Sequence, residues 1–284
     1  MLEALAAAGA KVTAIGASAF RLAVESGLAA DCLAFGDARL LGLFAPGGSC
    51  ELLAGFDLCI VYGRERDPVM ADALRRSGVA RVVSWPSHPQ AGMHIVDHLL
   101  GAVAEAGFPA AGRRPALAVP DLWRERAEAW LRERSVSAGF VALHPGSGGR
   151  AKRWPVAQFA ALAERLGRPV VWLLGPAEAE DAEARRLGER VGVVADGLPL
   201  ATLGGLLAQC RAYVGNDSGV THLAAAVGAP TVAIFGPTEP AVWAPRGEHV
   251  TVLGGPGQGG LAGVSVEAVA EALGQAAGAR GRDR

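Results

Sequence analysis

The sequence predicts an α/β protein built from two halves of the same architecture. In each half, short apolar segments typical of buried strands alternate with amphipathic segments of helical period. The connections are short and rich in Gly and Pro, which favours parallel sheets covered by helices on both faces. A composition shift over 107–120, which includes the pair Arg113-Arg114, separates the halves and predicts domains at residues 1–120 and 121–284.

Length and composition limit the classes of function. The chain has 284 residues, 51% hydrophobic and 19% charged, which is enough for two domains of ordinary size. A net charge of -1 argues against a nucleic-acid partner, because nucleic-acid binders usually carry a basic surplus. No apolar run approaches the roughly 20 residues of a membrane helix. The N-terminus carries Glu3 and no basic leader, so no signal peptide is expected.

The cysteines are scattered and form no close pair, which predicts buried apolar residues in a reducing compartment and not a disulfide or metal framework. They are Cys32, Cys50, Cys59 and Cys210. Together with the absence of a predicted leader, they favour a cytoplasmic location.

The first half is predicted to open on a helix over 2–8, whereas such sheets usually begin with a strand. Its expected strands cover 11–15, 31–35, 57–62 and 81–85, and its further helices cover 17–26, 49–54, 67–77 and 90–106. In the second half, Asp121 is expected to cap a helix over 121–135 whose Trp123 and Trp130 are core anchors. The strands that follow are predicted at 140–143, 170–174, 193–194, 212–214, 231–235 and 249–253. The helices between and after them are expected from Pro155 to about 166, up to 190, and at 200–209, 218–227 and 265–276.

The polar turn 216–219, between a strand and a helix, is the centre of the predicted site. A helix N-terminus offers unpaired N–H groups and a partial positive charge, which suit a phosphate. Gly219 would let a ligand approach the backbone, and His222, one turn further on, faces the same place. An ordinary capped helix is the alternative, but Asp217, Ser218, Gly219 and His222 together favour a ligand site.

Two further loops are expected to converge on this turn, because all three follow strands of one parallel sheet. The loop 144–152 is rich in Gly and Ser and carries Lys152, a point charge suited to a phosphate or ribose oxygen; a solvated basic turn is equally compatible. The other loop carries Glu178, with Glu180 nearby. A carboxylate there would accept two hydroxyls of a ribose or sugar, or else be a favourable charge in the first turn of a helix.

The order of the motifs in these loops resembles glycosyltransferase family 9, the bacterial heptosyltransferases that extend the lipopolysaccharide inner core. The motifs are His144-Pro-Gly-Ser147, Lys152-Arg-Trp-Pro155, Gly175-Pro-Ala-Glu178, Asn216-Asp-Ser-Gly-Val-Thr-His222 and Phe235-Gly-Pro-Thr238. Each motif alone is weak, whereas their order is fairly specific. The resemblance covers roughly residues 141–246 and is looser in the first half.

The resemblance implies the GT-B fold, in which two Rossmann-like domains face each other across a cleft and the closing helix packs back on the first domain. It implies that ADP-heptose binds to the C-terminal domain and a saccharide or lipid-linked saccharide to the N-terminal domain. Transfer would invert the anomeric centre without a metal or cofactor. The enzyme would work in the cytoplasm, peripherally at the inner-membrane surface.

The site residues that the resemblance implies lie in the second half. Lys152 and Glu178 would hold the ribose and phosphate region, while Asp217 and His222 would steady the phosphates, Lys152 or the sugar. Lys152 and Asp217 would also stabilise the departing nucleoside diphosphate. The full set of expected donor-binding residues is Ser147, Lys152, Glu178, Asp217, Ser218, Gly219 and His222.

The first half departs from the family pattern. Members open with a strand and a Gly-Asp loop whose Asp is the proposed general base, whereas this chain begins in the helix that follows. The pair Gly36-Asp37 comes after the third strand of the family sheet and is not assigned that role. A missing first strand would expose a sheet edge or a central gap. The alternatives to a transferase are therefore a non-catalytic nucleotide-sugar-binding protein and, more weakly, a GT-B-like epimerase.

Two histidines of the first half have the spacing of metal ligands. His94 and His98 are one helical turn apart, but the sequence offers no third ligand. Surface or packing roles are expected for both, with an acceptor contact from His94 as the alternative.

Overall fold

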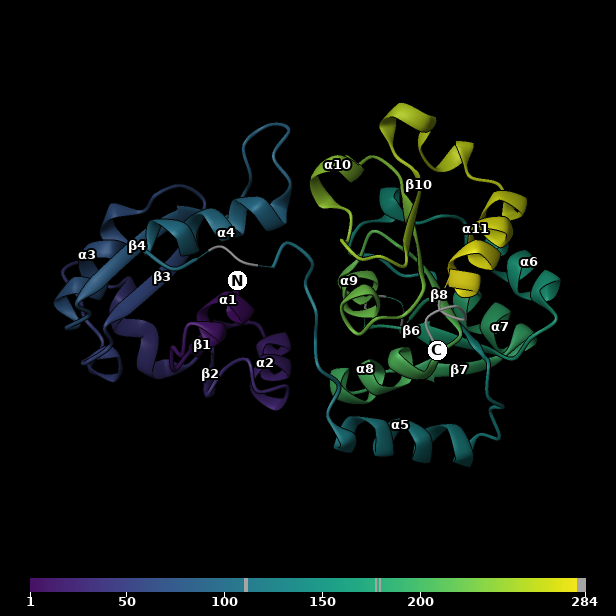
Figure 1. The fold of residues 1–284 in the computed structure, drawn as a ribbon, viewed down its shortest axis with the longest axis horizontal. Helices are drawn as coiled ribbons and strands as arrows, with labels where there is room; N and C mark the ends of the chain where they lie inside the picture. The colour runs from purple at the N-terminus through teal and green to yellow at the C-terminus, as the bar shows by residue number, and fades with distance from the viewer. Residues whose placement is uncertain (110–111, 177, 179, 280–284) are drawn as a thin grey trace. The chain divides into compact units, whose positions relative to one another are not determined.

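The computed structural model describes residues 1–109, 112–176, 178 and 180–279. The chain forms two compact units, Met1–Arg113 and Arg114–Arg284 (Figure 1). The residues just after this division belong with the second unit through specific contacts. The Leu117 N–H donates to Ala226 O at 2.8 Å, and Arg114 pairs with Glu248.

Unit 1 alternates short strands with helices, as the sequence predicts. Its strands are β1 (Thr13–Gly16), β2 (Asp31–Ala34), β3 (Leu58–Gly63) and β4 (Arg81–Pro86). Its α-helices are α1 (Leu2–Ala7), α2 (Arg21–Glu25), α3 (Pro68–Arg76) and α4 (Ile95–Glu105). Short 3-10 helices cover η1 (Ser18–Phe20), η2 (Ala38–Phe44) and η3 (Glu51–Leu53).

The strands of unit 1 form two separate parallel pairs, β1 with β2 and β3 with β4. Side chains of β1 and β3, among them Ile15 and Val61, nevertheless pack into one apolar cluster around Leu40 and Leu74. No ladder joins the two pairs within the described residues, and all six residues of β3 are only half-buried. The described strands of unit 1 therefore form two separate parallel pairs that share an apolar cluster, and they do not form one continuous sheet.

One helix of unit 1 begins later than expected. The sequence predicts a helix from residue 90, but α4 begins at Ile95, and His94 is its N-cap, accepting a hydrogen bond from Val96 N at Nδ1 (3.1 Å). Gly92 has φ of +77°, which is incompatible with a helix through this segment. The prediction for residues 90–94 is therefore wrong, because a turn with a left-handed glycine precedes the cap.

Unit 2 contains one larger sheet. Its strands are β5 (Val141–His144), β6 (Val170–Leu174), β7 (Val193–Asp196), β8 (Ala212–Asn216), β9 (Thr231–Phe235) and β10 (Val250–Gly254). Its α-helices are α5 (Asp121–Glu133), α6 (Val156–Leu166), α7 (Ala182–Val191), α8 (Leu200–Gln209), α9 (Gly219–Ala226), α10 (Pro240–Trp243) and α11 (Val266–Ala279). Its 3-10 helices are η4 (Arg150–Lys152), η5 (Pro256–Gln258) and η6 (Gly260–Gly263).

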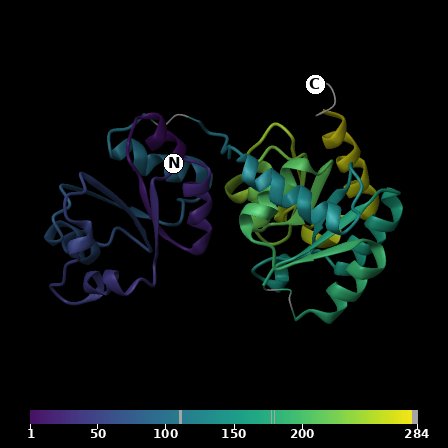
Figure 2. The same cartoon turned by 90° about the horizontal axis from the view of Figure 1, so that it is seen from below.

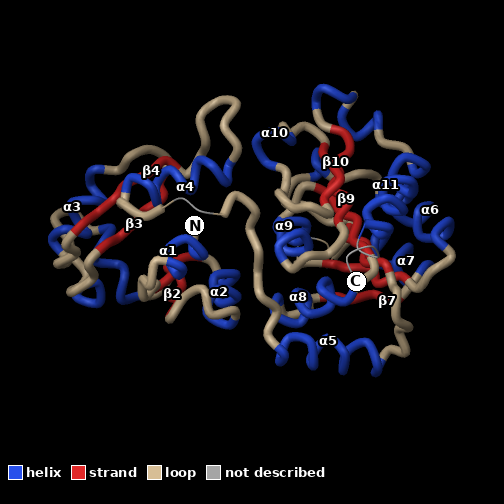
Figure 3. The backbone as a smooth tube through the Cα atoms, in the orientation of Figure 1, coloured by secondary structure: helices blue, strands red, loops and turns tan. Residues whose placement is uncertain are grey.

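The sheet of unit 2 is wholly parallel, in the order β10-β9-β8-β5-β6-β7. Its strands lie between the surrounding helices (Figure 3). Strands β5, β6, β8 and β9 are buried throughout, which explains their nearly continuous apolar sequences. The chain runs outward from β5 to β7 and then crosses back to β8, so the strand order reverses between β5 and β8.

Helices cover both faces of this sheet (Figure 1). Phe159 of α6, Leu187 of α7 and Leu273 of α11 share one apolar cluster with the strands. Helix α11 thus packs on the sheet of its own unit. Helices α8 and α9 belong to the opposite face, and none of the described helices is long and apolar enough to cross a membrane.

Helix α5 packs on the outside of α8 and lies in front of unit 2 in the view from below (Figure 2). Its Trp123 and Trp130 are buried, as predicted. A Cβ at Gly204 would lie 3.1 Å from the Trp123 ring, so small residues on α8 permit the close approach. The N-cap of α5 is Pro120, and the expected capping residue Asp121 is instead its first helical residue.

The cysteines of both units are free thiols. Cys50 and Cys210 are buried, as expected, whereas Cys32 and Cys59 are only half-buried. Burial raises the pKa of the Cys59 thiol to about 11, so this thiol is uncharged at neutral pH.

Candidate functional site

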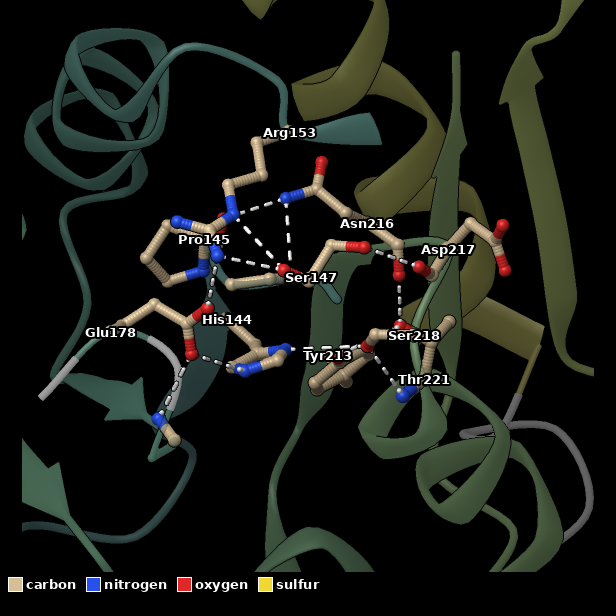
Figure 4. A network of polar contacts seen from close by, with 12 residues as sticks. His144, Pro145, Ser147, Arg153, Glu178, Tyr213, Asn216, Asp217, Ser218 and Thr221 are labelled. Carbon is tan, nitrogen blue, oxygen red and sulfur yellow. Dashed lines mark hydrogen bonds and ion pairs between the residues drawn. The ribbon is translucent and has the colours of Figure 1, made fainter. Parts of the chain in front are cut away.

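The three predicted loops meet at the carboxyl edge of the sheet in unit 2, where the strand order reverses. Strands β5 and β8 are neighbours there, with His144 opposite Gly215. Ligands of open α/β sheets bind outside the carboxyl ends of the strands at such a reversal. The topology therefore places the loops after β5 and β8, together with the loop after β6, around one position (Figure 4).

Asn216 fastens both ends of the loop that follows β5. Its Nδ2 donates to Pro145 O at 2.7 Å, and its Oδ1 accepts from Trp154 N at 2.9 Å. Asn216 is fully buried, so these two bonds replace water entirely. This role of Asn216 cannot be predicted from the motif that contains it, because its partners lie more than sixty positions away in the chain.

Asp217 joins three loops. Its carbonyl accepts from Ser147 Oγ at 2.8 Å, and its N–H donates to Ile234 O at 3.0 Å. Its Oδ2 accepts from both Lys152 Nζ and Thr238 Oγ1, each at 2.8 Å. The Asp217 side chain is 9% exposed and that of Lys152 is 35% exposed. Lys152 is thus held at its ammonium group and still reaches solvent.

Glu178 is held inside the site by the loop after β5. Its Oε2 accepts from Gly175 N at 3.2 Å, and Arg153 Nη2 lies 3.1 Å from its Oε1. The second contact is an ion pair without hydrogen-bond geometry, since Oε1 is buried without a hydrogen-bond partner. Arg153 also donates from Nε and Nη2 to Ser147 O, at 3.0 and 2.8 Å. Arg153, to which the sequence analysis gave no role, therefore links the loops after β5 and β6.

The position of Glu178 excludes one of its two interpretations. It lies in a turn, where its N–H donates to Gly175 O at 3.0 Å, and α7 begins only at Ala182. Asp181 is the N-cap of that helix and accepts from Ala184 N at 3.0 Å. Glu178 is therefore not a charge in the first turn of a helix.

His144 lies buried between the loops. Its Nδ1 is 3.4 Å from Ser218 Oγ, and its Nε2 is 3.9 Å from Glu178 Oε2 (Figure 4). Burial lowers the pKa of His144 from 6.5 to about 4, and the charge of Arg153 lowers it further in the same direction. His144 is therefore neutral at physiological pH and acts as an uncharged link between Ser218 and the Glu178 loop.

The lowered pKa of His144 predicts a loss of stability in mild acid. Between its folded pKa of about 4 and its unfolded value of 6.5, only the unfolded chain binds the proton. Stability from this group is complete above 6.5 and falls as the pH falls, by about 2 kcal/mol between pH 7 and pH 5. Urea unfolding at the two pH values measures this loss. The comparison variant is His144→Gln, which should lose about 2 kcal/mol less over the same interval; parallel pH profiles would contradict the assignment.

The first turn of α9 completes the site. Ser218 is its N-cap, and Ser218 Oγ accepts from Thr221 N at 3.4 Å. Thr221 Oγ1 is 3.0 Å from the hydroxyl of Tyr213, whose pKa is raised by burial. Gly219 and His222 are exposed on the same turn. The N-terminus of α9 is therefore accessible to an anion, and the buried hydroxyls of Tyr213 and Thr221 hold its first turn in place.

The predicted donor-binding residues are brought together by the fold. Ser147, Lys152 and Asp217 are in direct contact, and Arg153 joins Glu178 to Ser147. Ser147 and Glu178 are buried, at 4% and 3% exposure, and the hydroxyl and the carboxylate bind other groups of the protein. Donor binding by these residues stays a prediction, with Lys152 and the α9 turn as the groups that face solvent.

In unit 1, the candidate residues have internal partners. His98 is buried with its Nε2 2.6 Å from Pro86 O, and His94 caps α4. His98 therefore has the expected packing role, whereas His94 has a capping role that the sequence did not indicate. Asp37 caps η2, and hydrogen bonds from Arg39 lower the pKa of its carboxyl to about 2. The structure gives no reason to assign Asp37 the role of a general base.

Comparison with known proteins identifies the class. The model of the family "Glycosyltransferase family 9 (heptosyltransferase)" matches residues 69–265. The chain is 36% identical over 139 residues to lipooligosaccharide heptosyltransferase 2 of Haemophilus influenzae, a match that covers 45% of this chain and 39% of that protein. It is 32% identical over 195 residues to lipopolysaccharide heptosyltransferase 1 of Pseudomonas aeruginosa, covering 66% of this chain and 50% of that protein. In these matches, the chain spans half or less of the curated relatives' own length.

A solved structure shows the same fold. Superposition on the structure of E. coli ADP-heptose lps heptosyltransferase II gives a TM-score of 0.75 at 20% identity, covering 98% of this chain and 93% of that chain. Two Rossmann-like units of this kind define the GT-B fold, so the predicted fold class is confirmed. Since the family model matches more than half of the sequence, the chain belongs to glycosyltransferase family 9.

Proposed function

We propose that this chain is a glycosyltransferase that moves a heptose or a related sugar from an ADP-sugar to a lipopolysaccharide core or another saccharide acceptor. The observation that carries the proposal is the Lys152 ammonium, fixed 2.8 Å from Asp217, one residue before the N-cap of α9. A cation and a helix N-terminus at a strand-order reversal form a seat for a diphosphate. The similarity in fold to an E. coli ADP-heptose lps heptosyltransferase favours ADP-heptose as the donor.

The site suits the departure of a nucleoside diphosphate. As the bond between the anomeric carbon and the phosphate oxygen breaks, negative charge grows on the diphosphate. Lys152 and the N–H groups at the start of α9 are already oriented to stabilise that charge. We therefore propose transfer without a metal or cofactor, in which the acceptor oxygen attacks opposite the leaving group and inverts the anomeric centre. The acceptor hydroxyl proton must pass to a base, to which we assign no residue.

The acceptor and the location are part of the proposal. A saccharide, free or linked to lipid, would bind through unit 1, and the enzyme would act in the cytoplasm at the inner-membrane surface. No nucleic-acid partner is proposed, in keeping with the net charge of -1.

A non-catalytic nucleotide-sugar-binding protein is the second candidate. The observation that favours it lies in unit 1, where the Gly36-Asp37 pair does not supply the general base that transfer would need, since Asp37 caps a 3-10 helix and is bound by Arg39. A carboxylate held in this way is a poor proton acceptor, because its proton-free form is already stabilised.

Calorimetry with ADP and ADP-heptose, followed by a transfer assay, tests the two candidates. The transferase proposal predicts saturable binding of both and turnover on a lipopolysaccharide-core acceptor, unchanged by EDTA and with an inverted anomeric product. Binding without turnover on any core acceptor would favour the binding protein, and product formation without an acceptor would point to an epimerase. Failure to bind either nucleotide would overturn both main candidates.

A further inference from the structure

We propose that Thr238 is a positioning residue for Lys152 and that it acts through Asp217. The inference rests on the proposed function, in which Lys152 faces the donor diphosphate. Thr238 follows β9, and so belongs to a fourth loop beside the three that the sequence analysis assigned to the site. Its Oγ1 donates to Asp217 Oδ2 at 2.8 Å, on the same oxygen that accepts from Lys152 Nζ at 2.8 Å.

The backbone of Asp217 is held by hydrogen bonds that do not involve its side chain. Its N–H donates to Ile234 O at 3.0 Å, and its carbonyl accepts from Ser147 Oγ at 2.8 Å. The Asp217 side chain can then still rotate about its own bonds. The hydroxyl of Thr238 restricts this rotation, because it donates to Oδ2, the oxygen that also binds Lys152.

The loop that carries Thr238 also packs on the loop that carries Lys152. Gly236 is buried, and a Cβ at its position would lie 3.1 Å from Ala151 O, the carbonyl directly before Lys152. Thr238 is therefore coupled to the lysine loop by packing as well as through Asp217. A displacement of the 236–238 segment would reach Lys152 by both routes.

The charge of Asp217 explains why the effect must pass through Lys152. A carboxylate repels a diphosphate, so Asp217 assists an anionic donor by holding a cation and not by direct contact. Lys152 has three ammonium hydrogens and a long flexible stem. With one hydrogen directed to Asp217, the other two are available to the ligand from a fixed place. Ordering this side chain in advance lowers the entropy lost when the donor binds.

The experiment is a double-mutant cycle of Thr238→Val and Lys152→Met, read as ADP affinity by calorimetry. In the otherwise native chain, Thr238→Val should weaken ADP binding about 5- to 10-fold, which is the size of effect expected for the loss of one ordinary hydrogen bond. Thr238→Ser keeps the hydroxyl and should stay within about 2-fold of the native affinity. In the Lys152→Met background, Thr238→Val should add no further loss, because the cation that it positions is gone.

A purely structural role for Thr238 would give a different pattern. Its loss would then weaken ADP binding by the same factor in both backgrounds, which would overturn the inference, as would native affinity in Thr238→Val. Thr251→Val, on β10, is the matched control and should bind ADP normally. Should Thr238→Val fail to give a native circular-dichroism spectrum, Thr238→Ala takes its place in the cycle. Native protein that binds no ADP would overturn the proposed function instead, so the two failures are distinguishable.

Discussion

Lys152→Ala is expected to lower the rate of sugar transfer by about 100- to 1,000-fold, the usual effect of removing one preorganised donor to a developing negative charge. The Lys152 ammonium is paired with Asp217, and the Lys152 side chain is 35% exposed to solvent. Its loss leaves the diphosphate with the N-terminus of α9 alone. Steady-state kinetics with ADP-heptose and a core acceptor measure the effect, with native circular dichroism as the check on the fold.

The chain offers a matched control for this substitution. Lys11 is the only other lysine in the sequence and lies in unit 1 before β1, so Lys11→Ala removes the same charge elsewhere. It should leave transfer unchanged. Asp217→Ala should reduce transfer in the same direction as Lys152→Ala, because it frees the ammonium that it holds. Near-normal turnover in both site variants would refute the leaving-group role.

Gly146→Ala is expected to weaken ADP binding by about 10- to 100-fold, which corresponds to a loss of about 1.4 to 2.8 kcal/mol of binding free energy. A Cβ at this position would overlap the carboxylate of Glu178. Glu178 is buried and paired with Arg153, so it cannot swing into solvent without breaking that ion pair. The methyl group therefore forces the loops after β5 and β6 apart. Calorimetric titration with ADP measures the result.

The control for this change lies two residues away. Gly148 is exposed on the same loop, and a Cβ there would meet nothing within 4 Å. Gly148→Ala should bind ADP as the native chain does, although it carries the same added methyl group. If Gly146→Ala also bound ADP normally, the clamp between Glu178 and Arg153 would have no part in forming the donor site.

The sequence was sufficient to predict most of unit 2 because local signals determine it. Continuous apolar runs such as Val170–Leu174 and Thr231–Phe235 are strands at the predicted bounds. The apolar face of α6, with Phe159 and Leu162, is buried as its spacing indicates. The strand order could not be read from these signals, because hydrophobic period gives an element's type and not its neighbours.

The sequence indicates Lys152, Glu178 and Asp217 as candidates, because a charged residue in a Gly-rich loop is recognisable from local sequence alone. The fold brings their loops together, and their role in donor binding stays a prediction. Arg153 and Asn216 were given no role, because the partners that define their functions, Glu178 and Pro145, come from distant parts of the chain. The start of α4 was misplaced for a related reason, since a histidine N-cap is a weak sequence signal.

The divided sheet of unit 1 has a consequence for how the protein opens. A continuous sheet unfolds as one cooperative body, whereas two-stranded sheets are marginal on their own and depend on the helices packed against them. The described strands of unit 1 form two such pairs, whereas those of unit 2 share six strands in one ladder. Local openings should therefore begin in unit 1, and its backbone amides should exchange with solvent before those of β5 and β8. Unit 1, which would bind the acceptor, is thus expected to open locally at a lower free-energy cost than unit 2.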